Sequence, residues 1–198
     1  MRNFMIPPVI FHMLLFYMKQ GVQTSKDIDC IDFFAGVGRI KDSFQKKGYA
    51  AVAYEINNDS QTQDFLSVEG WITAFTWVLR LTEEGMTHWG TVCSTWVWIS
   101  RAITGRSSEN PLGFPDSKVT QDANVMVSRM CLLLLLVVSK GGSWLLEQPA
   151  SSLMTKHPRF SHMALAKTCS RLSRGWDVTE QQPESQHACG ATRNGSGL

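Results

Sequence analysis

The sequence predicts an α/β protein with a Rossmann-like, mostly parallel sheet that helices cover on both faces. Two observations predict this fold. From Asp27 onward, short apolar segments of strand length alternate with longer amphipathic segments of helix length, a pattern typical of parallel sheets. The first apolar segment also runs directly into the small residues AGVG at 35–38 and then into a charged helical segment. The 198 residues suit one ordinary domain, so we expect a single core.

The predicted elements follow one another in a regular order. We expect strands at 28–34, 50–55, 88–93 and 143–147, and helices at 38–47, 68–83 and 119–139. Gly48 and Gly85 are expected to end the first two helices, because glycine adopts the left-handed conformation common at helix C-termini. The run CLLLLLVV at 131–138 is apolar on all sides, so its helix should lie buried against the sheet. No periodic pattern is visible between Ser94 and Ser117, and a loop of this length is typically functional or disordered.

The two ends of the chain differ in composition from the domain that we assign to residues 27–176. Residues 1–26 are strongly apolar, and we expect a helix at 9–20 that packs on the domain. The uncharged stretch 4–18 is shorter than the roughly 20 residues of a membrane-spanning helix, but a membrane anchor there is kept as an alternative. Residues 177–198 are polar and small, which predicts a disordered tail.

Charge and cysteine usage narrow the class of protein. Nineteen basic and seventeen acidic side chains give a net charge of +2, which by itself predicts no polyanionic partner. The basic stretch 156–175 has a charge suited to nucleic-acid phosphates, although most such runs are solvated faces. The five cysteines form no CxxC pair and no metal-ligand spacing with the five histidines. We therefore expect no metal site and an intracellular protein, cytoplasmic or nuclear.

The turn at 35–38 predicts a nucleotide-type ligand site. Gly36 and Gly38 let the backbone approach a ligand, and the free amides at the start of the following helix favour polar or anionic groups. Ligands of open parallel sheets lie outside the carboxyl ends of the strands, where this turn falls. Glu55 ends the next predicted strand, and its two oxygens can accept hydrogen bonds from two ribose hydroxyls. The alternative interpretation is an ordinary tight turn beside a solvated acid.

Three short motifs in this region resemble those of a known family. The stretch IDFFAGVGRI resembles the first motif of class I S-adenosylmethionine-dependent methyltransferases, in particular the DLFAGxGG form of the cytosine-5 DNA methyltransferases. AYEINND resembles their second motif, and QDFLS has an acid where the family contacts the adenine amino group. The resemblance implies the class I methyltransferase fold and S-adenosylmethionine as the cofactor. The residues that it implies for cofactor binding are Asp32, Phe34, Ala35, Gly36, Gly38, Glu55 and Asp64.

Two weaker motifs bear on catalysis. WGTVCSTWVWISRAITGR resembles the family's fourth motif, which makes Cys93 the implied nucleophile, and WLLEQP resembles the sixth, which makes Glu147 the implied acid. In the family, a thiolate adds to carbon 6 of a flipped-out cytosine and an acid near ring nitrogen 3 stabilises the developing charge. Glu147 follows two leucines, where a carboxylate is costly to bury without a purpose. Arg101 and Arg106, in the loop after Cys93, are expected to hold phosphates beside the base.

Departures from the family pattern leave two functions open. Thr91 and Val92 replace the two prolines of the fourth motif, and no Gln-x-Arg-x-Arg motif is visible. Fewer than fifty residues follow the sixth motif, so we expect a fold that is incomplete at its C-terminal side and lacks a target-recognition domain. The first function is a methyltransferase-like protein acting on cytosine in nucleic acid. The second is an inactive remnant that serves as a cofactor-binding or interaction module, in which Cys93 is a small packed side chain and Glu147 a structural hydrogen-bond acceptor.

Overall fold

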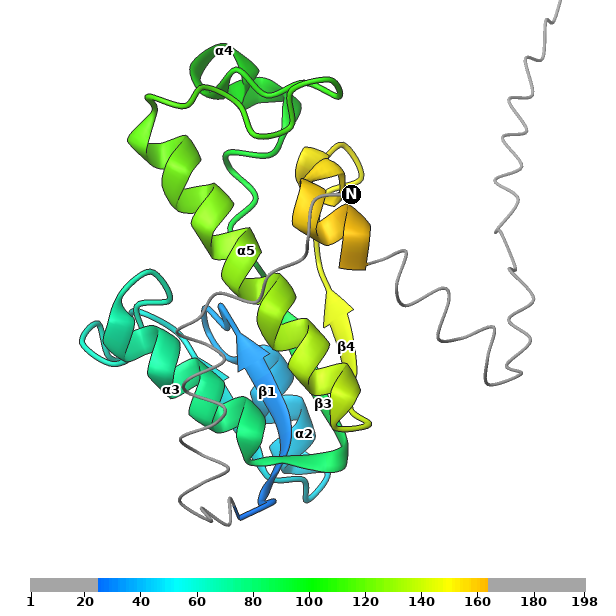
Figure 1. Cartoon of the computed structure of the whole chain (residues 1–198). Helices are drawn as coiled ribbons and strands as arrows, with labels where there is room; N and C mark the ends of the chain where they lie inside the picture. Colours follow the sequence, from blue (N-terminus) through cyan, green and yellow to red (C-terminus); the bar gives the residue numbers. More distant parts are fainter. Residues whose placement is uncertain (1–24, 164–198) are drawn as a thin grey trace, which may run out of the picture.

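A parallel sheet forms the centre of the molecule, and helices flank it on both faces (Figure 1). The computed structural model describes residues 25–163. The strands are β1 (Ile28–Phe33), β2 (Ala51–Tyr54), β3 (Leu81–Trp89) and β4 (Ser143–Leu146), in the spatial order β2-β1-β3-β4 with every neighbouring pair parallel. The predicted α/β class and Rossmann-like parallel sheet are confirmed at this level. The predicted N-terminal helix, its membrane-anchor alternative, the tail and most of the basic stretch lie outside the described residues.

The helices come between the strands, as the alternating pattern predicts. The longer ones are α2 (Arg39–Lys46), α3 (Val68–Leu79) and α5 (Lys118–Ser139), and the short ones are η1 (Trp98–Ser100), α4 (Arg101–Thr104) and η2 (Leu153–Lys156). Side chains mark where α3 and α5 begin. The Ser67 hydroxyl accepts a hydrogen bond from the Gly70 amide at 2.9 Å, and the Ser117 hydroxyl accepts one from the Thr120 amide at 3.4 Å. Such caps satisfy amides that have no partner inside the helix.

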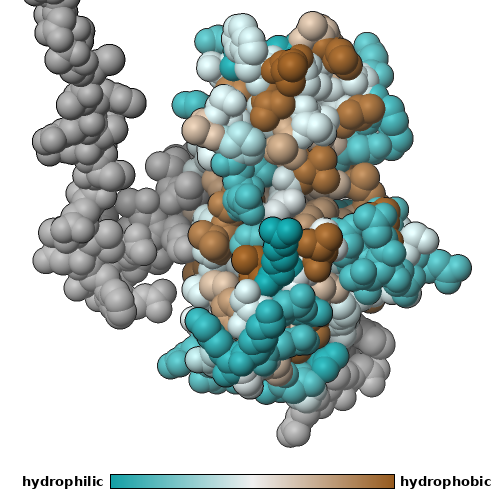
Figure 2. Space-filling model, turned by 180° about the vertical axis from the view of Figure 1, so that it is seen from behind, coloured by the Kyte–Doolittle hydropathy of each residue, from teal (hydrophilic) through white to brown (hydrophobic). Residues whose placement is uncertain are grey.

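The two faces of the sheet carry different helices. Residues alternate along β1, so Ile31 and Phe33 face the layer of α3 and α5, while Asp32 faces α2 on the other side. The Lys41 amide, in the first turn of α2, donates a hydrogen bond to the Asp32 carboxylate at 3.2 Å. Seen from behind, the lower half of the molecule is mostly hydrophilic (Figure 2). Among the helices of residues 25–163, α2 lies on one face of the sheet, and α3 and α5 together cover the other.

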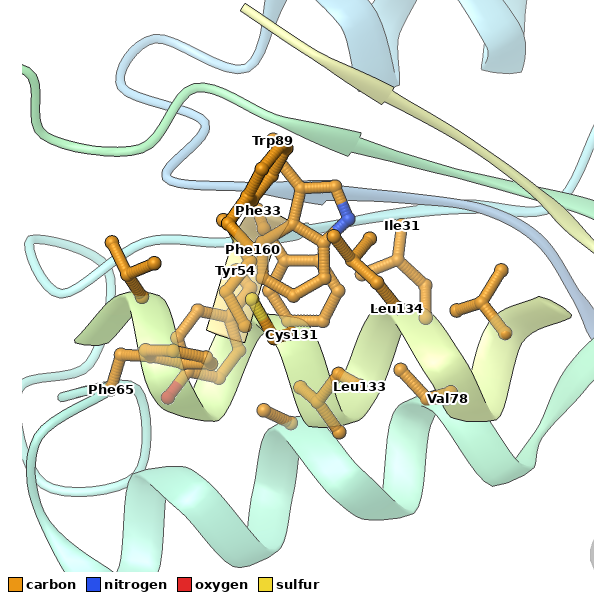
Figure 3. Close-up of a cluster of buried hydrophobic side chains, with 14 of the residues drawn as sticks. Ile31, Phe33, Tyr54, Phe65, Val78, Trp89, Cys131, Leu133, Leu134 and Phe160 are labelled. Carbon is orange, nitrogen blue, oxygen red and sulfur yellow. The ribbon is translucent and has the colours of Figure 1, made fainter. Parts of the chain in front are cut away.

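An aromatic cluster fills the space between the sheet and α5 (Figure 3). The rings of Phe33 and Trp89 stack at 4.0 Å between centroids, and Phe65 meets them edge-on at 6.3 and 6.0 Å. From α5, Leu133 and Leu134 pack into the same buried cluster. Each such side chain contributes roughly 1.5–3 kcal/mol by its burial. The stacking joins the last residues of β1 and β3, and so fixes where the loops that follow these strands begin.

The boundary between the second helix and the third strand differs from the prediction. Helix α3 ends at Leu79 instead of residue 83, and β3 occupies Leu81–Trp89 instead of 88–93. Gly85 is a buried strand residue and ends no helix. The reason is an irregularity in the pairing with β1, where Ile28 pairs with Leu81 but Cys30 pairs with Met86. Glycine is common at such bulges, and a bulged strand does not keep the two-residue alternation by which strands are recognised.

Helix α5 is buried against the sheet, as predicted, but not on every side. Val127, Met130, Leu134 and Val137 are fully buried, whereas Leu135 is exposed. By length and composition alone α5 could cross a membrane, since its mean hydropathy reaches 1.7. Core helices of soluble proteins meet the same criterion. Its packing on β3 and β4 accounts for its apolar character within the part of the chain that the structure describes.

The predicted loop between Ser94 and Ser117 contains η1 and α4 and packs on the N-terminal end of α5. Arg106 joins the two, because its guanidinium donates hydrogen bonds to the Asn124 side chain at 2.9 Å and to the Thr120 carbonyl at 3.3 Å. Figure 1 shows α4 beyond the arrowheads of the strands, at the far end of α5. The segment therefore lies past the carboxyl edge of the sheet.

Candidate functional site at the carboxyl edge of the sheet

The carboxyl ends of all four strands meet at one edge of the sheet, because every pair is parallel. At this edge β1 leads to α2 on one face, whereas the chain after β3 leads to α5 on the opposite face. The two loops therefore separate between β1 and β3. In open α/β sheets, ligands bind outside the carboxyl ends at such a topological switch point.

The turn after β1 has the backbone geometry of a ligand-binding loop. Phe34, Gly36 and Gly38 all have positive φ, at 58°, 53° and 73°. Only glycine adopts this region without cost, so the conformation of Phe34 is strained by about 1–3 kcal/mol. The Phe34 amide donates to the Tyr54 carbonyl at 2.8 Å, which joins the turn to the end of β2. A Cβ on Gly36 would meet nothing within 4 Å, so the outer side of the turn is open.

Glu55 lies beside this turn, as predicted. The Gly36 amide donates a hydrogen bond to Oε2 of Glu55 at 2.9 Å. The other oxygen, Oε1, accepts from the amide and the side chain of Asn57 at 3.2 and 3.0 Å. A carboxylate has about four lone-pair positions, so Oε2 keeps one for a ligand. A ribose diol that used both oxygens would have to displace the Asn57 side chain.

Asp64 lies in the loop after β2, and its hydrogen bonds are made within that loop. Its Oδ1 accepts from the Leu66 amide at 2.8 Å, and its carbonyl accepts from the Ser67 hydroxyl at 2.9 Å. Arg129 of α5 donates to the Phe65 and Ser67 carbonyls, both at 2.8 Å. These bonds fix the entry to α3. Asp64 is half-buried, and its other carboxylate oxygen, Oδ2, is the atom that an adenine contact would use.

Asp32 and His88 form a buried pair across the switch point. Asp32 on β1 is paired in register with His88 on β3, and the Asp32 side chain is only 1% exposed. Oδ1 of Asp32 lies 2.9 Å from Nδ1 of His88, while Oδ2 accepts the Lys41 amide of α2. The start of α2 and strand β3 therefore meet at one carboxylate of β1.

The sequence predicts that Cys93 ends a strand at 88–93, but β3 ends at Trp89, so Cys93 lies in the loop that follows. This loop is tied to the loop after β4, because the Gln148 side chain donates to the Thr91 carbonyl at 2.6 Å. Cys93 is half-buried. The other described cysteines are buried, and burial raises the pKa of Cys30 and of Cys131 to about 12. Among the described thiols, Cys93 is thus the one placed at the site and accessible from outside.

Glu147 does not have the predicted surroundings. Its side chain is 79% exposed, so the expectation of a carboxylate buried for a purpose is wrong. Its backbone amide donates to the Trp89 carbonyl at 3.0 Å, which continues the sheet for one residue and turns the side chain outward. Oε2 lies 3.7 Å from Nε2 of His88. The implied catalytic acid is therefore solvated in this conformation, although it does lie at the correct edge.

Arg106 is not available to hold phosphates, contrary to the prediction. It is 2% exposed, and its guanidinium lies 3.5 Å from the ring centroid of Trp96. Burial lowers the pKa of Arg106 to about 10. Its hydrogen bonds to Asn124 and Thr120 explain its position, because a buried guanidinium must find acceptors. The sequence shows a basic residue in a loop and does not indicate that the loop folds around it.

Arg101 and Trp98 lie at the surface of the same segment. The Arg101 guanidinium is 4.1 Å from the ring centroid of Trp98, whose ring is mostly exposed. Ile99 and Ile103 are exposed beside them, and Figure 2 shows apolar atoms over this upper part of the molecule. Arg101 thus remains a candidate for an anionic group, at the far end of α5 instead of at the turn.

The structure adds His88 to the predicted site. No short-range pattern identifies it, because Asp32 and His88 are 56 positions apart and meet only through the strand register. Within residues 25–163, no group of three or more metal-ligating side chains could hold a metal ion. No family model, curated protein or solved structure matches the chain. The fold and the site together define a Rossmann-like α/β protein with a glycine turn and an acid at its carboxyl edge.

Proposed function

We propose that the chain binds S-adenosylmethionine at the carboxyl edge of its sheet and is a methyltransferase-like protein. The observation that carries this proposal is the hydrogen bond from the Gly36 amide to the Glu55 carboxylate at 2.9 Å. It brings a glycine turn and an acid at the end of the next strand together at the switch point, where Rossmann-type folds bind adenosyl ligands. The sequence resemblance supports the choice among such ligands.

The residues at this edge fit the chemical groups of the cofactor. The open side of Gly36 admits a ligand against the backbone, and the unpaired amides at the start of α2 suit a carboxylate. Glu55 accepts a ribose hydroxyl through the free position of Oε2. The bound cofactor would supply a methyl group on a positively charged sulfur. Cys93 and the exposed Glu147 border the same edge from the loops after β3 and β4, where an acceptor would approach.

Transfer to cytosine in nucleic acid is the narrower form of the proposal. It requires Glu147 to turn inward from its exposed position, and it receives no support from the buried Arg106. Cys93 would add to the base as a thiolate. A change of Cys93 to serine should then abolish methyl transfer to a cytosine-containing duplex while leaving cofactor binding intact.

The hydrogen bonds that Glu55 already accepts favour a second function. Three of its roughly four acceptor positions are used by Gly36 and Asn57, so the turn is already closed by the protein itself. A remnant that keeps the fold as an interaction module would have this property. In that case the carboxylate stabilises the turn and no cofactor binds.

Calorimetry with S-adenosylmethionine separates a site that binds the cofactor from a remnant that serves only as an interaction module. We expect the wild-type chain to bind and Glu55→Ala to bind at least tenfold more weakly. Glu84→Gln is a matched control, because Glu84 is an exposed acid in β3 away from the carboxyl edge. Binding equal to wild type is expected for this control. Absence of heat with the folded wild-type chain would support the remnant.

A further inference from the structure

The buried pair of Asp32 and His88 is the feature of the site that the proposed cofactor function does not use. Both side chains are enclosed, at 1% and 8% exposure, and they lie between the cofactor turn and the loops of Cys93 and Glu147. Burying a carboxylate and an imidazole is costly unless each is bonded to a partner. The two side chains meet this condition by bonding to each other and, for Asp32, to the Lys41 amide.

The contact fixes the orientation of the imidazole ring. An ionised carboxylate only accepts hydrogen bonds, so Nδ1 of His88 must be the nitrogen that carries a proton toward Oδ1 of Asp32 at 2.9 Å. Asp32 is in turn held by the Lys41 amide on its other oxygen at 3.2 Å. In the neutral ring this leaves Nε2 with a free lone pair.

Nε2 lies on the side of the ring that faces the exposed Glu147 carboxylate. Its nearest acidic neighbour is Oε2 of Glu147 at 3.7 Å, which is longer than a hydrogen bond. The neighbours in the same cross-sheet row are Asp32 on one side and Leu145 on the other. Gly90 follows the histidine by two residues, and a Cβ there would lie 3.9 Å from the imidazole. The free nitrogen is thus bordered by Gly90, by the apolar Leu145 and by one exposed acid, Glu147.

The geometry points to His88 as the proton acceptor of this site, with Asp32 as its positioning residue, and to a methyl acceptor that carries an O–H or N–H group. This inference rests on the proposed binding of S-adenosylmethionine. The oxygen or nitrogen of the acceptor bonds to the methyl carbon, the carbon–sulfur bond breaks and its electron pair stays on sulfur. The acceptor's proton passes to Nε2 of His88. The imidazolium that forms lies between two carboxylates, which stabilise it.

The orientation of the ring is tested without any ligand. In the full chain labelled with nitrogen-15, side-chain correlation spectra distinguish a protonated Nδ1 from a protonated Nε2, and His88→Gln assigns the signal. We expect His88 to be protonated at Nδ1 and to shift toward the Nε2–H tautomer in Asp32→Asn. A wild-type signal from the Nε2–H tautomer, or no change in Asp32→Asn, overturns the inference.

The acceptor class is tested with labelled S-adenosylmethionine and three probes. Catechol offers O–H, histamine offers N–H, and a cytosine-containing duplex offers a carbon acceptor. We expect transfer to catechol or histamine that falls about 10²-fold or more in His88→Gln, with calorimetric binding of the cofactor unchanged. His162→Gln, on the surface, should keep the wild-type rate.

The outcomes distinguish a failure of this inference about His88 from a failure of the proposed function. If the wild-type chain shows no cofactor binding, the proposed function fails and the nitrogen-15 spectra alone decide the orientation of His88. If the cofactor binds but only the duplex is methylated, or neither small probe is, the acceptor class is wrong. Equal rates in wild type and His88→Gln would show that His88 accepts no proton.

Discussion

Arg106 and His157 bring two ionisable groups into the buried region around Trp96. The guanidinium lies over one face of the indole at 3.5 Å, and the imidazole meets the ring edge-on at 5.9 Å. Burial, with smaller effects from the charges of Arg106 and Arg159, lowers the pKa of His157 to about 4. Nδ1 of His157 has no hydrogen-bond partner among the described residues. The histidine is therefore held neutral in the folded protein, and the two side chains are structural.

This arrangement predicts a loss of stability in acid. In the unfolded chain His157 takes up a proton near its ordinary pKa of 6.5, but in the folded chain only near 4. Its contribution is fully present above pH 6.5 and is lost as the pH falls toward 4, by up to about 3 kcal/mol. We expect His157→Phe to lose less stability than wild type between pH 7 and 4.5, measured by urea unfolding. Parallel losses in the two proteins, with His162→Gln as the surface control, would contradict this.

At the level of single residues, the sequence predicts the groups that local pattern determines. Gly36 and Glu55 are recognised because the turn and the strand end can both be located from hydrophobicity and glycine positions. His88 and Arg106 are not, because their roles depend on partners far along the chain. The exposure of Glu147 is missed for a similar reason. The two leucines before it indicate a buried strand, but they do not indicate the direction of the side chain that follows.

At the level of elements, the sequence pattern alone assigns the wrong role to Gly85. Gly85 resembles a helix C-cap but lies in the irregular pairing of β3 with β1. The strand-to-helix pattern around β1, α2 and β2 is predicted to within one or two residues because its alternation is regular. The start of β3 is missed because Glu83 and Glu84 are exposed acids, which suit the end of a surface helix as well as a bulged strand.

Gly70 in the first turn of α3 offers a test of how tightly this helix meets the loop after β2. A Cβ at this position would come within 1.9 Å of the Asp64 carbonyl and 2.8 Å of the Tyr54 hydroxyl. The Tyr54 hydroxyl also donates to the Gly70 carbonyl at 2.9 Å. Alanine favours a helix by about 1 kcal/mol over glycine, but we expect Gly70→Ala to destabilise the protein by about 1–3 kcal/mol through overpacking.

Urea unfolding of Gly70→Ala beside Thr73→Ala measures this effect. Thr73 lies one turn further along the same helix and is half-buried. Thr73→Ala therefore measures the effect of helix propensity without the steric clash expected at Gly70. A Gly70→Ala protein as stable as wild type would mean that α3 does not approach the Asp64 loop as described.

At the level of the whole molecule, the topology limits what the site can bind. The strand order β2-β1-β3-β4 puts the switch point between β1 and β3, and the glycine turn, Glu55, Asp32 and His88 all lie around it. This arrangement is shared by proteins that bind dinucleotides and by those that bind S-adenosylmethionine. The fold could be predicted from the sequence because the alternation of strand-length and helix-length segments is typical of a parallel sheet. The choice of ligand could not, because it depends on how side chains from separate strands meet.

A thermal unfolding series decides between these ligands. A ligand at 100 times its dissociation constant stabilises the folded state by about 2.7 kcal/mol, which for a chain of this size raises the Tm by roughly 5–10 °C. We expect S-adenosylmethionine to raise the Tm of the wild-type chain and to raise that of Glu55→Ala by about half as much or less. NAD at the same concentration should have little effect. The physical reason is that Glu55 at the turn keeps only one free acceptor position. Its negative charge repels a pyrophosphate and attracts a positively charged sulfonium. A larger Tm increase with NAD than with S-adenosylmethionine would contradict both the ligand and the electrostatic argument for it.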